Sequence, residues 1–251
     1  MSALDLPATR IQSGYSRFYQ NMAAICLLVA FVGFAPTYWV PAWKGTLQVP
    51  LVAHIHGMVF FSWTLLFLAQ TSLVAIGDRA LHRKVGVLGI ALAATMVITA
   101  TLMARHSLDQ GIALGLAREA RAFALVPLSA AVYFAVLIAY AAKNTRRPEL
   151  HKRTMVVATV SLLQPAVARW FIFLLAPAGA VGPVPVAFTV LPGLLSDLPL
   201  VYAMLHDWRK SGRVHPVYVI GTITLVAMQV LRVPVAATNA WQTFAGWFAS
   251  L

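Results

Sequence analysis

Histidine residues stand at the beginning of several long apolar runs in this sequence. His82 and His151 open such runs in the segments L-H-R-K and L-H-K-R, and His215 opens another in V-H-P. Imidazole nitrogens bind iron, copper and zinc, and the positive end of a helix dipole favours the neutral ring that a metal requires. These residues predict a metal site at one end of a helical bundle. Alternatively, they are ordinary basic residues at a membrane surface.

Basic residues follow two of these histidines directly. They are Arg83 and Lys84 in the first run, and Lys152 and Arg153 in the second. Long basic side chains at the end of an apolar run extend toward lipid phosphate. We therefore expect all four to contact the head groups of a bilayer.

A second pair of histidines lies inside an apolar run. His54 and His56 fall about one helical turn into the run 51–75 and precede Gly57. Residues two apart on an α-helix point about 200° apart, so both rings cannot face one small ligand in a regular helix. A polar group at that depth needs a partner. One of the two is expected to bind a metal or to handle a proton, and packing in the core is the alternative.

Two arginines and one acid also fall inside apolar runs. Arg169 and Arg232 cannot lose their protons in practice, so each needs an anion, a water-filled cavity or access to the surface. Asp197, in L-S-D-L-P-L, is the acid that could serve as their counter-ion or carry a proton. The arginines, together with Gln229, could instead hold a bound anion such as a haem propionate, a lipid phosphate or a carboxylate substrate.

The elements that must position these residues are membrane spans. Hydrophobic residues make up 60% of the 251-residue chain and charged residues 10%, and the mean hydropathy is +0.78. Soluble domains carry about a quarter charged residues. The sequence therefore predicts an all-α integral membrane bundle, and the single cysteine, Cys26, excludes an intrachain disulfide.

Apolar runs of about 20 residues are long enough to cross a bilayer. They predict seven spans, one helix followed by three hairpins, at about 21–41, 51–75, 84–104, 122–142, 154–176, 185–206 and 215–234. The predicted organisation is an N-terminal segment 1–20, a membrane domain 21–236 and an interfacial C-terminal helix 237–251.

The distribution of lysine and arginine predicts the orientation. The N-terminus and the loops 76–83, 143–153 and 207–214 hold most of these residues, and basic loops stay in the cytoplasm. We expect a bacterial-type inner (cytoplasmic) membrane, with the N-terminus in the cytoplasm and the C-terminus outside. The formal charge of +12 is thereby explained without a nucleic-acid partner.

Two segments outside the spans are expected to be helical. The segment 105–121 is too polar to span and predicts an amphipathic helix at the outer face. In the C-terminal segment, Trp241, Phe244 and Trp247 recur at helical spacing, which suits a helix in the membrane interface. Packing of this helix on a neighbouring subunit is the alternative. Pro165, Pro192 and Pro199 predict kinks in two spans.

The order H-x-H-G at 54–57, L-H-R-x-x-G at 81–86 and L-H-K-R at 150–153 resembles bacterial multi-pass membrane proteins of unknown function. The helix starts with histidine and a basic residue also look distantly like those of cytochrome b561-like and ferric-reductase-like membrane proteins. That resemblance implies a haem held by histidines on facing helices, and electron transfer.

Three functions remain open at this point. The first is a membrane redox protein or oxidoreductase with a histidine-bound metal, as haem, non-haem iron or copper. The second is a proton-coupled or anion transporter or channel, lined by kinked spans. The third is a non-catalytic subunit or assembly factor of a larger membrane complex, or of a homo-oligomer. The sequence contains no phosphate loop, nucleophile elbow or zinc-protease signature, so it predicts no reaction type.

Overall fold

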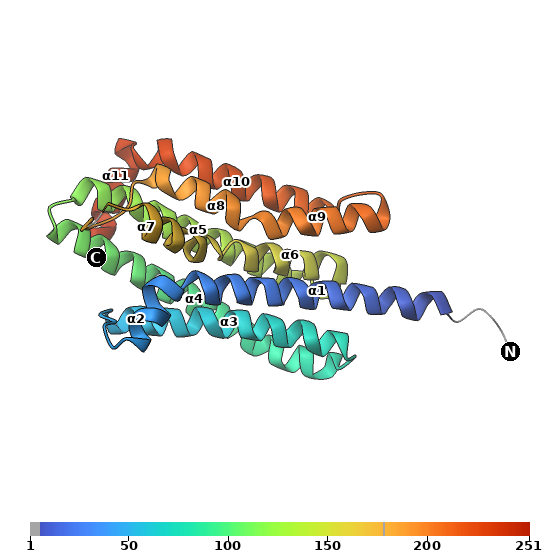
Figure 1. Ribbon diagram of the computed structural model, residues 1–251. Coiled ribbons are helices and arrows are strands. Elements are labelled where there is room, and N and C mark those ends of the chain that lie inside the picture. Colours follow the sequence, from blue (N-terminus) through green and yellow to red (C-terminus); the bar gives the residue numbers. More distant parts are fainter. Residues whose placement is uncertain (1–5, 178) are drawn as a thin grey trace.

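The computed structural model describes residues 6–177 and 179–251, and this part of the chain folds into an all-α bundle (Figure 1). Its helices are α1 (Leu6–Gly33), the π-helical η1 (Ala35–Trp39), α2 (Val40–Trp43), α3 (Leu51–Ala75), α4 (Arg79–Ala113), α5 (Ala117–Lys143), α6 (Pro148–Val160), α7 (Gln164–Leu175), the short 3₁₀ helix η2 (Val186–Thr189), α8 (Val190–Ser196), α9 (Leu198–Ser211), α10 (Pro216–Ala236) and α11 (Asn239–Ser250).

The apolar helices confirm a multi-pass membrane fold. Among the described residues, six helices or helix pairs are long and apolar enough to cross a membrane. A seventh span is completed when Arg17–Gly33 is joined to Ala35–Trp43, which follows at a bend of 41°. The described residues therefore contain six spans, or seven when the bent pair is counted as one, and the predicted span 51–75 coincides with α3 at both ends.

The helices run roughly side by side and place the loops at two ends (Figure 1). One end carries the turns 76–78, 144–147 and 212–215, and we call it the basic end because it is rich in lysine and arginine. The other carries 44–50, 114–116, 176–177 with 179–185, and 237–238, and we call it the opposite end. The α3–α4 turn at the basic end is set by Gly77 at φ 89° and by Asp78, whose carboxylate accepts the Leu81 amide at 2.9 Å.

A proline bends the first span near the opposite end. Pro36 has no amide hydrogen, so the carbonyl of Val32 lacks its usual helical donor. The indole of Trp170 donates to this carbonyl at 3.0 Å, and the indole of Trp39 donates to the Phe31 carbonyl at 2.9 Å. Side chains on both sides of the bend thereby donate hydrogen bonds to the carbonyls that it leaves without helical donors.

The prediction of a separate amphipathic helix at 105–121 is wrong. These residues instead lengthen α4 to Ala113 and begin α5 at Ala117. Close packing of the two helices explains the difference, because a Cβ on Gly111 would lie 2.5 Å from that of Ala120. Arg105 binds Asp109 one turn away, so the polar residues extend the helix beyond its apolar part.

The C-terminal helix forms as expected and packs on α4 and α5 of its own chain (Figure 1). The Trp241 indole donates to the Arg121 carbonyl at 2.7 Å, and Arg105 donates to the Phe248 carbonyl at 2.6 Å. Phe244 and Trp247 remain largely exposed, which leaves an aromatic face for the membrane interface or a partner.

Candidate functional site

The span Pro148–Leu175 is interrupted near its middle, between α6 and α7. There the amides of Leu162 and Leu163 bond to carbonyls only three residues back, at 3.2 and 2.9 Å. Pro165 follows and lacks the amide that a continuous helix would use. Such a tightened segment inside a long helix commonly marks a hinge or a functional site.

The span Val186–Ser211 is interrupted in the same way at Asp197, between α8 and α9. The Asp197 amide reaches the Leu194 carbonyl at 3.3 Å, and Pro199 begins the next helix. Because α7 packs against α8, the two interruptions lie in one region of the bundle. Polar backbone freed at a break inside a membrane must be buried in protein or line a cavity.

Arg232, on α10, is held among these helices by side chains. It is 2% exposed. Its Nε donates to the hydroxyl of Ser129 on α5 at 2.8 Å, and its Nη1 donates to Oε1 of Gln164 at 2.9 Å. Gln164 in turn donates to the Thr189 carbonyl at 2.9 Å. Arg232 therefore joins α5, α7 and α10 next to the two breaks.

Asp197 faces this group with unused acceptors. It is 3% exposed, and neither carboxylate oxygen has a hydrogen-bond partner among the described residues. Gln229 and Ser196 are polar neighbours, and Arg232 acts on the carboxylate through space. Nη2 of Arg232 and Oε1 of Gln229 also lack partners. We call Asp197, Gln164, Gln229 and Arg232 the central cluster.

A glycine lets the central cluster approach α8. A Cβ on Gly193 would lie 3.0 Å from Cδ of Gln229 and 3.2 Å from Nε2 of Gln164. Such distances are tighter than most Cβ contacts, so a larger residue would push both amide side chains away. The absence of a side chain at Gly193 thus allows both glutamines to sit against the break.

A second polar group lies at the basic end. Arg153 donates through Nε and Nη2 to both oxygens of Asp207, at 2.9 and 3.0 Å, and it also binds Glu149. The rings of Tyr19 and Tyr218 lie beside it, with the Arg153 guanidinium 5.8 Å from the centre of the Tyr218 ring. We call Arg153, Asp207, Tyr19 and Tyr218 the basic-end cluster.

The expectation that Arg153 contacts lipid phosphate is therefore corrected. Arg153 is 4% exposed, since the neighbouring α9 supplies a carboxylate that the sequence pattern could not place. Lys152 binds Glu149. Arg83 and Lys84 lie exposed at the basic end, and their contact with lipid head groups stays a prediction.

The three histidines at helix starts make separate local contacts. Nδ1 of His151 donates to the Ala141 carbonyl at 2.9 Å, while Nδ1 of His215 accepts the Val217 amide at 3.2 Å and caps α10. Partial burial, followed by the charge of Arg153, lowers the pKa of His215. His82 has a buried Nδ1 without a hydrogen-bond partner.

The two histidines of α3 lie toward the opposite end. Nδ1 of His54 pairs with the Tyr38 hydroxyl at 2.7 Å. The His56 ring lies 4.2 Å from that of Phe60, and its Nδ1 is buried without a partner. Arg169 lies 3.9 Å above the Phe34 ring and donates to the Pro165 carbonyl at 2.8 Å. Arg169 therefore has contacts different from those of Arg232, which binds Ser129 and Gln164. A shared anion site for the two arginines stays a prediction.

The described histidines do not meet in a group of three metal-binding side chains. In residues 6–177 and 179–251, no three histidine, cysteine or acidic side chains come close enough to hold a metal ion. The donor set thus does not fit a polynuclear or facial metal site. A haem held by one or two of these histidines stays a prediction.

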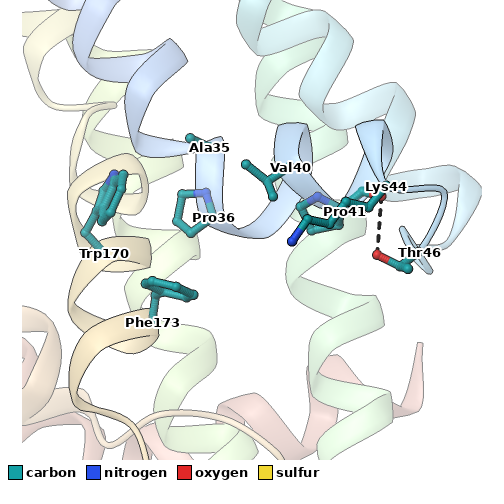
Figure 2. Close-up of a pocket in the computed structure, with 8 residues that line it drawn as sticks. All are labelled: Ala35, Pro36, Val40, Pro41, Lys44, Thr46, Trp170 and Phe173. Carbon is teal, nitrogen blue, oxygen red and sulfur yellow. Dashed lines mark hydrogen bonds between the residues drawn. The ribbon is translucent and has the colours of Figure 1, made fainter.

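A crevice of about 360 Å³ opens at the opposite end, between α2 and α7 (Figure 2). Its walls are mainly apolar, with Pro36, Trp170 and Phe173 on one side and Lys44 on the other. It contains none of the predicted site residues. The crevice is therefore distinct from the central cluster.

Four residues of these clusters were not among the predicted site residues, namely Gln164, Asp207, Tyr19 and Tyr218, and neither was Ser129, which binds Arg232. For Asp207 a signal was available, because an acid in L-H-D-W ends an apolar run that also contains Asp197. Ser129 and Gln164 are common inside membrane helices, so their sequence carries no such signal. No family model, curated protein or solved structure matches this chain.

Proposed function

We propose that this chain is a proton-translocating membrane transport protein and that Asp197 is the group that carries the proton. The observation that supports this most directly is the buried Asp197 carboxylate. It lies at a break in one span, beside a break in the next, with both oxygens unpaired. Ionisable groups inside membrane domains are costly, and they commonly mark ion or substrate pathways.

Discontinuous helices support transport over a purely structural role. In many transporters the substrate and ion sites are built near the bilayer midplane by broken helices. Here α6–α7 and α8–α9 are both broken near their middles, and Gln164 of the first break and Gln229, a neighbour of Asp197, both lie against Gly193 of α8. A structural span would be expected to keep its helical hydrogen bonds, because lipid offers no replacement for them.

The neighbouring charge favours a proton over a metal cation. Ions such as Ca²⁺ and Mg²⁺ take about six or more oxygen ligands, whereas a proton needs a single oxygen. The guanidinium of Arg232 would also repel a metal cation bound at Asp197. A neutral acid formed by proton uptake carries no charge for Arg232 to repel.

Protonation of Asp197 would change the contacts that Arg232 makes. The ionised carboxylate attracts Arg232, whose Nη2 has no partner in this conformation. Proton uptake converts the carboxylate to a neutral acid and removes that attraction, which leaves Arg232 on Gln164 and Ser129. Because Arg232 connects α5, α7 and α10, this exchange couples the proton to helix positions at the breaks.

The basic loops give the proposed proton path a direction across the membrane. Basic loops favour the cytoplasmic side, so the basic end would face the cytoplasm and α11 would lie outside. Protons would then pass between the opposite end and the basic end by way of Asp197.

The test is proton flux in liposomes that contain the purified protein. A potassium diffusion potential drives the flux, and a trapped pH-sensitive dye reports it. The wild-type protein should acidify the liposomes, and Asp197→Asn should reduce the rate to that of protein-free liposomes. Glu149→Gln, a change at a half-exposed acid outside the central cluster, should leave the rate unchanged.

Two outcomes would overturn the proposal. One is a wild-type protein that passes no protons under the imposed potential. The other is an Asp197→Asn variant whose flux equals that of the wild type.

A further inference from the structure

Three spans of the bundle carry buried polar and apolar residues in the same order. From the basic end inward, α6 and α7 present Arg153, then Val160, then Gln164. On α10 the order is Tyr218, then Leu225, then Gln229. On each of these helices a polar residue of the basic-end cluster is thus separated from one of the central cluster by an apolar residue.

The third span, which contains α9, has the same order from the basic end inward, although its chain runs in the opposite direction. On α9, Asp207 lies at the basic end, Leu200 follows inward, and Asp197 lies at the break. An apolar level therefore lies between the two polar clusters on every helix that contributes to both. This level is not expected from helix packing alone, since polar residues occupy the buried faces above and below it.

The side chains at this level form one dry cluster. We call Val160, Leu163, Leu200 and Leu225 the apolar layer; they are at most 2% exposed and belong to a single group of contacting side chains. Cys26 of α1 belongs to the same group and is 0% exposed. With Cys26, this group of contacting side chains reaches four helices, α1, α6, α9 and α10.

Close helix packing seals the layer on its basic side. A Cβ on Gly221 would lie 2.8 Å from Cγ1 of Val157, so α10 and α6 are in close contact there. A narrow passage lined only by apolar side chains excludes water and stops the ions and protons that water would carry. The breaks at 161–163 and at Asp197 adjoin the layer, so hinge motion at either break would move its side chains apart.

We propose that the apolar layer, which includes Leu225 of α10, is the barrier that separates the central cluster from the basic end. The barrier rests on the proposed function for its purpose, because it would control when Asp197 exchanges protons with that side. In the conformation described here the barrier is closed. Leu225 would accordingly control access to Asp197 by excluding water, since its side chain forms no hydrogen bond with either polar cluster.

The native Cys26 gives a test that does not depend on transport. It is the only cysteine of the chain, and it is fully buried in the core group that contains the apolar layer as well as Tyr19 and Tyr218. A thiol reacts with a water-soluble methanethiosulfonate reagent only where water can support the thiolate. In wild-type liposomes Cys26 should stay unlabelled, whereas in Leu225→Ser the hydroxyl and the vacated volume admit water and labelling should become nearly complete.

Matched variants separate entry of water from loss of the fold. Leu225→Met keeps an apolar side chain of similar volume and should leave Cys26 unlabelled. Ile223→Ser makes the same type of change on the lipid side of α10, where the side chain is 63% exposed, and should also leave it unlabelled. Leu200→Ser should increase labelling as Leu225→Ser does, since it opens the same layer from α9.

The barrier and the proposed function would be refuted by different results. If Cys26 stays unlabelled in both Leu225→Ser and Leu200→Ser, the barrier is refuted, whatever the proton flux of the wild type. Labelling of the Ile223→Ser variant to the same extent would also refute it, because the reactivity would then reflect general loosening. If the labelling follows the expected pattern but Asp197→Asn transports normally, the barrier stands and the proposed function fails.

Discussion

Removal of the charge on Asp207 should destabilise the protein through the arginine that it leaves behind. Arg153 and Asp207 are 4% and 2% exposed, and two hydrogen bonds of 2.9 and 3.0 Å join them. In Asp207→Asn the shape of the side chain is kept, but the guanidinium loses its buried counter-charge. A buried charge without compensation is unfavourable because it has given up its hydration.

The size of the effect follows from what remains around Arg153. Breaking a buried ion pair by removing one partner costs about 3–5 kcal/mol. Glu149 still binds Arg153 in the variant, so we expect the lower part of that range, about 3 kcal/mol. In a chain of this size, each kcal/mol lowers the midpoint of unfolding by about 2–4 °C. The expected decrease is therefore about 6–12 °C.

The assay is thermal unfolding in one detergent, followed by circular dichroism. Glu149→Gln is the matched control, because a half-exposed ion pair contributes below about 1 kcal/mol. Adding Arg153→Met to Asp207→Asn removes the stranded charge and should recover most of the lost stability. If the double variant is instead as unstable as the two single changes added together, the pairing argument is refuted.

Two further changes test packing and pH dependence. Gly33→Ala would place a Cβ 2.5 Å from that of Ala166 and should cost about 1–3 kcal/mol in thermal unfolding, whereas Gly57→Ala, with nothing within 4 Å, should not destabilise; equal losses would contradict the packing argument. Because burial lowers the pKa of His215 in the folded state, its contribution to stability is present above the unfolded pKa of about 6.5 and is lost as the pH falls. In His215→Asn, which keeps an acceptor for the Val217 amide, the decrease in unfolding temperature from about pH 7.5 to about pH 5.5 should be smaller than in the wild type; an unchanged decrease would assign the pH dependence to other groups.

Polar residues inside the spans show how far the sequence could be interpreted. Asp197, Gln229 and Arg232 stood out because a charge or amide in an apolar run needs a partner, and the structure brings all three together. The pattern could not show that Arg169 lies on the Phe34 ring. Depth along a helix can be counted from the sequence, but the direction of a side chain around it depends on which neighbours pack there.

Two neighbouring residues at the start of α6 illustrate the same limit. His151 and Arg153 occur in one L-H-K-R segment and had been assigned to a metal and to lipid phosphate, yet they bind the Ala141 carbonyl and Asp207. Asp207 is 54 residues away from Arg153 in the chain. A pairing over that distance is determined by how α6 and α9 pack.

The sequence by itself determined the class of fold and the number of spans, because the length of an apolar run must match the thickness of a bilayer. Its prolines also indicated which spans are interrupted, since proline lacks the amide that a continuous helix needs. Only the tertiary structure decided that the two breaks lie in one region of the bundle, that Arg232 is held by Ser129 and Gln164, and that Leu225 lies in an apolar layer between two polar clusters. These features depend on contacts between helices far apart in the chain, and local sequence patterns carry no record of which helix faces become neighbours.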